Sequence, residues 1–322
     1  MDFLGQRMPY VTAFSKALGT GMMISVDSPI DDKVRSAMES LIEDYEHVLS
    51  RFRNDSLIAA IGKAEHGGSF DFPDWCAPLF DLYDALFSAT SGAIDPCVGE
   101  DLIRLGYDAS LSFTVTQDAP EHLGALRGRA VWGRDVTRHG TTLVTHEPVQ
   151  LDFGACGKGY LVDLLGRMLQ SSQFVIDAGG DLLIHAEQPI SVALEDPEDQ
   201  SHAIGIAHIA NGALCASAPS RRHWNVAVNE RTQIAIHHLL NAIDGLPAQQ
   251  TEASWAYVPA NATLNLARDY PTAVADGLAT ALFVSDVAQL QRTFDFTYAT
   301  LDESRQIAVS RNFPAELFLR SA

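Results

Sequence analysis

The sequence predicts an α+β fold in which helices pack on mixed and antiparallel sheets. About four long segments place apolar residues at helical spacing, and several pairs of short apolar strand runs lie between them. The 322 residues are enough for one large domain or two modest ones. Because no Pro/Ser-rich tract divides the chain, we expect a single domain over 1–322, with any ligand cleft between two subdomains whose boundaries cannot be located.

Composition indicates a folded protein with an acidic surface. Hydrophobic residues make up 47% and charged residues 20% of the chain, while 41 acidic and 22 basic side chains give a formal net charge of −19. Such a surface repels nucleic acid and anionic lipid, so we expect neither as a partner. The four cysteines lie far apart without a C-x-x-C pair, which argues against a zinc site or a redox motif.

The N-terminal twenty residues lack a basic region followed by a sustained apolar run. No lipid-attachment cysteine follows them, and no segment is long and apolar enough to span a bilayer. We therefore expect a cytoplasmic protein with no membrane partner.

The first third of the chain predicts one strand and two helices. A strand is expected over 18–26, a helix from Lys33 with Asp31 or Asp32 as its cap, and a helix over 75–89 that Gly92 ends. The Asp95–Pro96 pair and Gly99 then predict a fixed turn rather than continued helix.

Residues 50–56 predict a turn that follows the first long helix. Arg51 and Arg53 flank Phe52 in a chain otherwise short of positive charge. A solvated turn is the default interpretation of the two arginines. For Phe52 an aromatic lid over a flat ligand is the alternative.

Residues 150–169 predict a short buried strand, a turn with three glycines and a helix that begins near Lys158. Past the turn, an apolar helical stripe is formed by Tyr160, Leu161, Leu164, Leu165, Met168 and Leu169. Glycines let backbone amides approach a ligand, and a helix N-terminus favours an anion, so this segment is a candidate phosphate cradle. It matches no standard nucleotide motif, and an ordinary strand-to-helix turn is the other interpretation.

The second half alternates strands and turns before a final helix. We expect a helix–strand insert over 112–146, two strands meeting at Gly179–Gly180, a further strand over 190–197, a strand leading into a basic loop over 213–224, and two histidines on a strand within 235–248. The last strong helix is expected over 271–286, with Thr272 as its N-cap and Leu278 and Leu282 inward.

Asp276 and Thr280 are four residues apart on that last helix and therefore share one face. A carboxylate and a hydroxyl presented together suit a hard, oxygen-seeking cation such as Mg²⁺. A capping or surface pair is the alternative.

Six short motifs occur in an order that identifies a family. They are LGT (18–20), SRF (50–52), GAIDPCVG (92–99), LDFGACGKGYLVD (151–163), AGGD (178–181) and ADGLATAL (275–282). With this set, which spans nearly the whole chain, the sequence resembles the ApbE-type flavin transferases, the FAD:protein FMN transferase family.

The resemblance implies an activity and a site. Members cleave the pyrophosphate of FAD with Mg²⁺ and attach FMN through a phosphoester bond to a Ser or Thr of an acceptor protein. By analogy, Asp276, Thr280 and the backbone carbonyl of Ala155 would hold Mg²⁺, and His238 would be the base for the acceptor hydroxyl. The implied FAD contacts are Leu18, Phe52, Ala93, Ile94, Asp95, Asp152, Lys158 and a residue near Leu240.

The departures from the family pattern fall in the part expected to face the acceptor. The T-S-G loop is Ala216–Ser217–Ala218, and the aromatic residue expected later is Ser220. In the family's H-I-I-D-P segment, aspartate and proline are replaced by Asn241 and Ala242. Because asparagine cannot act as a carboxylate base, two alternatives stay open: hydrolysis of FAD to FMN and AMP, and a non-catalytic flavin-binding protein.

Overall fold

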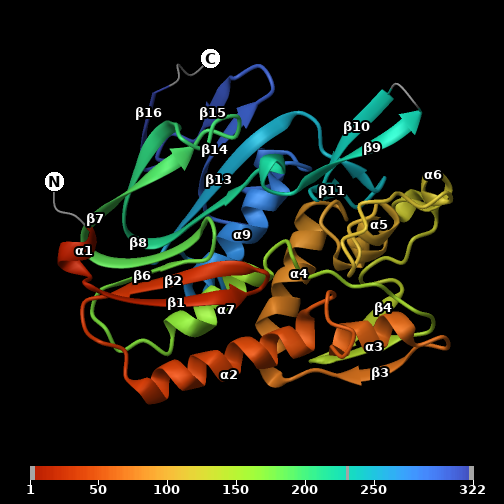
Figure 1. Cartoon of the computed structure of the whole chain (residues 1–322), viewed down its shortest axis with the longest axis horizontal. Coiled ribbons are helices and arrows are strands. Elements are labelled where there is room, and N and C mark those ends of the chain that lie inside the picture. The colour runs from red at the N-terminus through yellow and green to blue at the C-terminus, as the bar shows by residue number, and fades with distance from the viewer. Residues whose placement is uncertain (1–3, 230–231, 319–322) are drawn as a thin grey trace.

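The computed structural model describes residues 4–229 and 232–318 and confirms the α+β class (Figure 1). Its main sheet has nine strands, and all strand pairs of the named strands in the described residues are antiparallel. The strand order is β1 (Tyr10–Ala17), β2 (Thr20–Val26), β6 (Phe174–Asp177), β7 (Asp181–Glu195), β8 (Ala203–Ser217), β13 (Thr251–Pro259), β14 (Thr297–Asp302) and β15 (Ile307–Val309), with β16 (Ala315–Leu317) pairing with β8.

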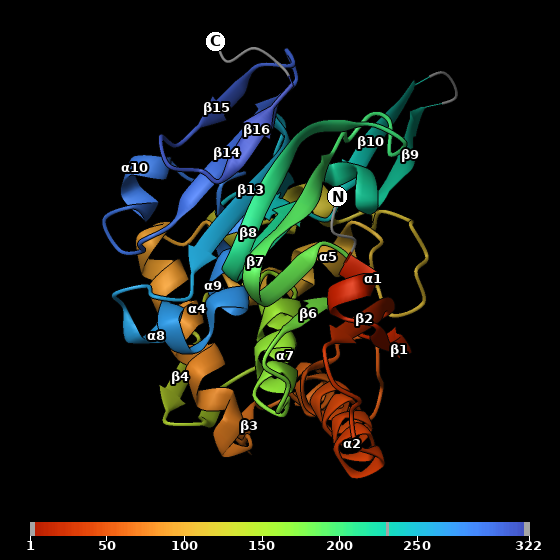
Figure 2. The ribbon, with the colours of Figure 1, turned by 90° about the vertical axis from the view of Figure 1, so that its left-hand side faces the viewer.

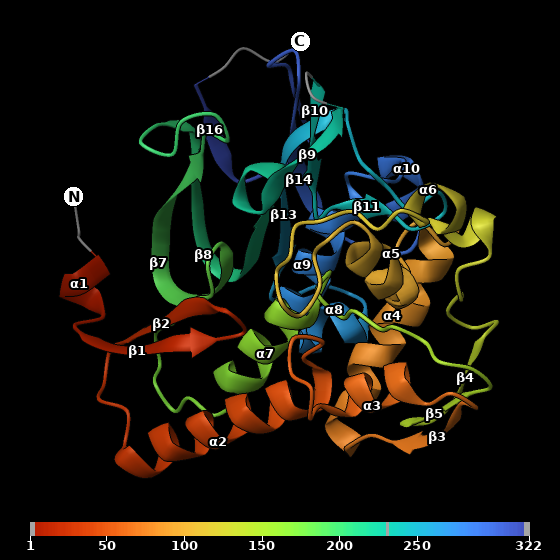
Figure 3. The same cartoon turned by 45° about the vertical axis from the view of Figure 1, so that its right-hand side comes forward.

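Residues 27–173 leave the main sheet after β2 and return to it at β6. This insert contains α2 (Asp32–Leu49), α3 (Leu57–Lys63), α4 (Ala77–Ala89), α5 (Gly99–Arg104), α6 (Ala119–His122), α7 (Gly157–Gly166), and the three-stranded sheet of β3 (Gly68–Asp71), β5 (Thr142–Thr145) and β4 (Val136–His139). Most of it lies to the right of the main sheet in Figure 3, whereas α7 lies against the sheet itself.

The remaining elements are one short helix near the N-terminus and the elements between β8 and β14. They are α1 (Leu4–Arg7), the hairpin of β9 (His223–Asn229) and β10 (Thr232–His237), the short pair β11 (Leu240–Asn241) and β12 (Leu246–Pro247), and the helices α8 (Asn265–Asp269), α9 (Pro271–Ala281) and α10 (Val287–Leu290). Single 3-10 turns occur at Asp74–Cys76, Pro96–Val98, Ala125–Arg127 and Pro219–Arg221.

The main sheet separates two apolar clusters because successive strand residues point to opposite faces. On β8, Ala213 and Cys215 belong to the larger cluster, which includes α2, α4, α7 and α9. Leu214 between them belongs to the smaller cluster on the other face. Helices α7 and α9 thus fill the space under the sheet, as Figure 2 shows from the side.

Several predicted features are confirmed. Asp31 caps α2 by accepting a hydrogen bond from Lys33 N (2.7 Å), and α4 ends with Gly92 at a positive φ of 88°. The two glycines at 179 and 180 also have positive φ, 70° and 108°, and join β6 to β7. A residue with a side chain is strained at such angles, so the turn requires glycine there.

Four predicted boundaries are wrong. Residues 150–153 form no sheet strand, although Leu151 and Phe153 are buried, and α7 ends at Gly166, before Met168 and Leu169. Gly99 begins α5 instead of ending a turn, because the 3-10 turn before it continues directly into the helix. The strand expected over 190–197 is the second half of β7.

Thr272 is not the N-cap of α9, because Asp163 of α7 takes that role from outside the helix. The Asp163 carboxylate accepts hydrogen bonds from Thr272 N (3.1 Å) and Ala273 N (2.8 Å). Gly159 permits this approach, since a Cβ there would lie 2.3 Å from the Thr272 carbonyl oxygen. The carboxylate of a buried aspartate therefore satisfies two amides that α9 cannot satisfy itself.

Replacing Asp163 by alanine should lower the free energy of unfolding by about 2–4 kcal/mol at pH 5, because two buried N–H groups lose their acceptor. Burial raises the pKa of Asp163 to about 7, and the ordinary value is about 3.9. The stabilising contribution is therefore complete below about pH 4 and is lost as the pH rises through about 7.

Chemical denaturation of Asp163→Ala and the unaltered protein between pH 5 and 8 measures this difference. We expect the difference to shrink with rising pH. The control Asp31→Ala removes an exposed cap of α2 and should cause a smaller loss. A difference that grows with pH would contradict the raised pKa of Asp163.

Candidate functional site at the junction of α7 and α9

Helices α7 and α9, already joined through Asp163, are linked a second time by Asp276, which lies on α9. Its Oδ2 accepts a hydrogen bond from Gly159 N in the first turn of α7 (3.0 Å). Asp163 on α7 binds the start of α9 and Asp276 on α9 binds the start of α7, so each helix supplies a carboxylate to the other. At this junction Gly277 also packs against Cys156, where a Cβ would be 3.3 Å from the Cys156 Cβ.

A buried charge cluster lies at this junction. Lys158 Nζ forms an ion pair with Asp181 Oδ2 and lies 3.6 Å from Asp276 Oδ1. Both carboxylates are almost completely buried, whereas 33% of the Lys158 side chain is exposed. Asp181 is the last residue of the AGGD motif (178–181), but no local sequence pattern marks it as a site residue.

The cluster contains more negative than positive charge. Burial, together with the charge of Asp181, raises the pKa of Asp276 to about 8, and burial also raises the pKa of Asp181. Burial by itself lowers the pKa of Lys158, but the charges of Asp181 and Asp276 outweigh it and raise that pKa. Two carboxylates that share one ammonium favour a further cation or a proton.

Ala155 and Thr280 meet beside this cluster. The Thr280 hydroxyl donates a hydrogen bond to the Ala155 carbonyl oxygen (3.4 Å). Thr280 lies one turn after Asp276 on α9, and Ala155 lies in the turn that leads into α7. Three oxygen donors of different kinds, a carboxylate, a hydroxyl and a carbonyl, are therefore presented at one helix junction.

Arg51 is buried, and the predicted solvated turn is wrong for this residue. Only 7% of its side chain is exposed, and it forms an ion pair with Asp152. Its Nη1 donates to the Tyr107 carbonyl oxygen (2.5 Å). Arg53 stays nearer the surface, where it pairs with Asp55 and Glu43.

Phe52 is 41% exposed, as a residue that contacts a flat ligand would need to be. Its ring meets Tyr107 edge to face with 5.4 Å between centroids, and the Arg51 guanidinium lies 4.2 Å from the Phe52 centroid. Tyr107 in turn stacks on Trp224 at 5.7 Å. Sequence reasoning missed Tyr107, because no local pattern relates it to Phe52 or Trp224.

The segment of Ala93, Ile94 and Asp95 is buried. Asp95 caps the following turn through Cys97 N (2.8 Å) and pairs with the enclosed Arg129 (3.4 Å). Its side chain therefore has structural partners already, and its predicted contact with FAD stays a prediction.

Arg129 connects this segment to the one that carries His238. Its Nη2 donates to the Ala242 carbonyl oxygen (2.7 Å), and its Nε lies 2.8 Å from Asp101 Oδ2. Ala242 N in turn donates to the Ala93 carbonyl oxygen (3.0 Å). Sequence reasoning missed Arg129, because its partners are distant in the chain.

His238 lies just after β10 and is half-buried. Its Nδ1 is 3.2 Å from the Arg222 carbonyl oxygen. Because a carbonyl only accepts, Nδ1 carries the hydrogen in the neutral ring, and Nε2 keeps a free lone pair. Burial lowers the pKa of His238 to about 4, so the ring is neutral at physiological pH.

Leu18 and Leu240 lie on different elements, the β1–β2 turn and β11. Leu18 has a positive φ of 53° in the turn between β1 and β2, and its N–H donates to Glu46 Oε1 (2.7 Å). Leu240 is buried in a cluster with Tyr107 and Trp224. Their contacts with FAD stay predictions, as do those of Asp152 and Lys158.

The altered segments keep an ordered local structure. Asn241 Oδ1 accepts a hydrogen bond from Ile243 N (3.0 Å), which an aspartate would also do at this turn. Ser217 and Ser220 line a small pocket of about 40 Å³ together with Gly179, Gly180 and Trp255. The changes at Ala216, Ala218 and Ser220 therefore alter side chains around this pocket.

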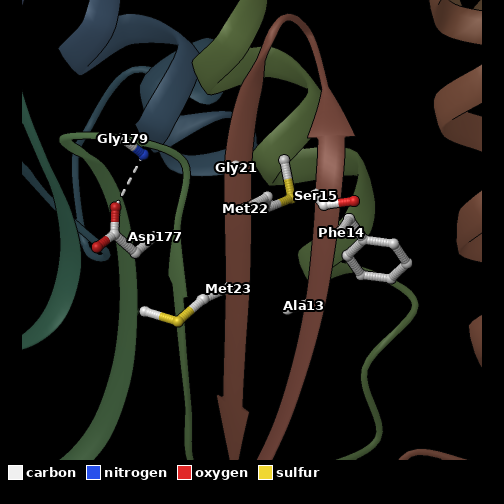
Figure 4. A pocket seen from close by; sticks show the side chains of 8 residues that line it. All are labelled: Ala13, Phe14, Ser15, Gly21, Met22, Met23, Asp177 and Gly179. Atoms are coloured by element: carbon white, nitrogen blue, oxygen red, sulfur yellow. Dashed lines mark hydrogen bonds between the residues drawn. The ribbon is translucent and has the colours of Figure 1, made fainter.

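A larger pocket of about 290 Å³ lies beside the β1–β2 hairpin and the end of β6 (Figure 4). None of the residues predicted for the site lines it. Its lining is mainly apolar, and the carboxylate that borders it, Asp177, already accepts a hydrogen bond from Gly179 N (2.9 Å). We therefore place the candidate site at the helix junction instead.

Residues 4–229 and 232–318 contain neither a cluster of three metal-ligating side chains nor a helix that could cross a membrane. No three or more His, Cys, Asp or Glu side chains there form a group that could hold a metal ion. No described helix combines the length and apolarity that crossing a membrane requires.

Comparison with known proteins relates the chain to flavin transferases. A FAD:protein FMN transferase of Treponema pallidum (strain Nichols) is 27% identical over 286 residues, with 78% of this chain and 72% of that protein covered. The ApbE protein of Thermotoga maritima matches the structure with a TM-score of 0.76 at 20% identity, covering 95% of this chain and 99% of that one. The flavin transferase ApbE from Vibrio cholerae matches with a TM-score of 0.74 at 17% identity, covering 94% and 98%.

The two structural matches show a shared fold. A profile of the ApbE family also matches residues 18–300, which is most of the chain. The chain therefore belongs to the ApbE family.

Proposed function

We propose that this protein is a Mg²⁺-dependent FAD:protein FMN transferase that attaches FMN to a Ser or Thr of an acceptor protein. The observation that supports it most is the helix junction, where Asp276, Thr280 and the Ala155 carbonyl lie beside Lys158 in a chain of the ApbE family. The relative in Treponema pallidum is named for this activity.

The donors at the junction fit a magnesium ion. Mg²⁺ prefers oxygen ligands and usually takes one or two carboxylates while it keeps water and phosphate oxygens. Asp276, Thr280 and Ala155 offer such a partial set, with one carboxylate, one hydroxyl and one backbone carbonyl. The excess of buried carboxylate over ammonium also favours a cation there.

When bound, Mg²⁺ would neutralise charge on the FAD pyrophosphate and so ease its cleavage. The chain's own residues would do the positioning, which dominates phosphoryl transfer. Lys158, whose side chain is one-third exposed, would meet phosphate oxygens. Phe52 would lie against a ring of FAD, since its side chain is exposed while Arg51 and Tyr107 pack against its ring.

His238 would accept the proton of the acceptor hydroxyl at Nε2. The hydroxyl oxygen would form a bond to the phosphorus on the FMN side of the pyrophosphate, and the P–O bond to the bridging oxygen would break. AMP would leave with that oxygen. The neutral ring and the tautomer fixed by Arg222 suit this role.

An assay of purified protein with FAD and MgCl₂, with and without candidate acceptor proteins, tests the proposal. AMP release is followed together with flavin fluorescence on a denaturing gel. A fluorescent acceptor band together with AMP is the expected result. AMP without a labelled protein would indicate a FAD pyrophosphatase, bound FAD without AMP would indicate a flavin-binding protein, and neither would contradict the proposal altogether.

Asp276→Ala should abolish Mg²⁺-dependent turnover while the protein stays folded, because the only carboxylate of the proposed ligand set is lost. Activity at saturating FAD and a melting curve measure the two effects. Asp286→Ala, which removes an exposed cap of α10, is the matched control and should keep its activity. Undiminished turnover in Asp276→Ala would remove α9 from the mechanism.

His238→Ala should reduce the rate of FMN transfer by about 10²–10⁴-fold, which is typical when a general base is removed. FAD binding, measured by fluorescence quenching, should change little. Because the base acts in its neutral form and its pKa is about 4, the rate of the unaltered protein should not fall through His238 protonation until the pH approaches 4. Transfer within threefold of normal in His238→Ala would exclude the histidine as the base.

A further inference from the structure

Lys158 lies between two buried carboxylates that come from different elements. Asp181 is the first residue of β7, immediately after the Gly179–Gly180 turn, and Asp276 lies on α9. The ammonium forms its close ion pair with Asp181 and stays 3.6 Å from Asp276. The lysine is thus shared unequally, with Asp181 as its main partner.

We propose that Asp181 is a positioning residue that holds and neutralises Lys158, so that Asp276 stays available to a divalent cation. The identity of the cation as Mg²⁺ rests on the proposed function. Asp181 then affects metal affinity through its charge, which balances that of Lys158 beside Asp276, and it is not itself a metal ligand.

Lys158 and a metal cation would compete for the carboxylate of Asp276. An ammonium and a metal cation both bind carboxylate oxygens, and unlike charges a few ångströms apart attract each other more strongly in a buried site than in water. If Asp181 lost its charge, Asp276 would be the nearest carboxylate to Lys158. The lysine would then occupy the carboxylate that the cation needs.

Asp181 is buried with Lys158 as the partner of its carboxylate. Its side chain is 1% exposed, and its Oδ1 has no hydrogen-bond partner among the described residues. A buried carboxylate with an unsatisfied oxygen is costly. Its hydrogen bond and ion pair through Oδ2 both go to Lys158, so holding this lysine is the role that the contacts of Asp181 support.

The test is a double-mutant cycle read by Mg²⁺ affinity in the absence of FAD. MgCl₂ is titrated calorimetrically at pH 8 into the metal-free full chain and into Asp181→Asn, Lys158→Met and the double variant. Melting curves without metal check that each protein is folded. Asp177→Asn is the control, because it removes a charge from the same hairpin while an asparagine oxygen can still accept from Gly179 N and Gly180 N.

We expect Asp181→Asn to weaken Mg²⁺ binding by about tenfold or more, because the freed ammonium competes for Asp276. The double variant Asp181→Asn/Lys158→Met should bind Mg²⁺ within about threefold of the unaltered protein, since it lacks both the competitor and its neutraliser. Asp177→Asn should change the affinity by less than about threefold, because its carboxylate forms no ion pair with Lys158 in the described residues.

A double variant that binds as weakly as Asp181→Asn, or more weakly, would overturn the inference, because Asp181 would then act as a ligand or as structural support. If Asp181→Asn does not fold, the double variant decides against the unaltered protein: Mg²⁺ binding within about threefold supports the inference, and weaker binding overturns it. FMN transfer with no effect of Asp181→Asn on Mg²⁺ affinity would reject the inference alone. The expected order of affinities in a protein that transfers no FMN would reject the proposed function alone.

Discussion

The reciprocal contacts between α7 and α9 are the constraint on which the candidate site depends. Asp163 of α7 binds the first amides of α9, and Asp276 of α9 binds an amide in the first turn of α7. Gly159 lets the backbones approach closely enough for both. Because these helices lie under the main sheet, the oxygen donors Asp276 and Thr280 stand on a packed helix, and Ala155 lies in the turn that leads directly into α7.

Exposure of the cationic side chain distinguishes the Lys158 cluster from the Arg129 cluster. Arg129 is fully enclosed and pairs with Asp95 and Asp101, and it also binds the Ala242 carbonyl, so its hydrogen bonds tie segments together. Lys158 also faces two carboxylates, but a third of its side chain is exposed. Both clusters have two carboxylates for one cationic side chain, and only the Lys158 cluster lies where a ligand can reach it.

Local patterns predicted the elements but not the contacts between them. The spacing of Asp276 and Thr280 places them on one helical face, and paired glycines at 179–180 predict a turn. In contrast, the capping of α9 by Asp163 joins residues more than a hundred positions apart, and no motif near Thr272 signals it. Residues 150–153 were predicted as a strand because an extended apolar run has the same pattern whether or not another strand pairs with it.

The two replacements in the segment after His238 fit the structure for different reasons. Asn241 keeps the oxygen that accepts the Ile243 amide, so the turn needs no carboxylate. Ala242 has an N–H, which proline lacks, and donates it to the Ala93 carbonyl. This bond joins the segment that carries His238 to the segment expected to contact FAD. The replacement at Ala242 therefore adds a bond between the two segments, whereas the replacement at Asn241 leaves the local turn intact.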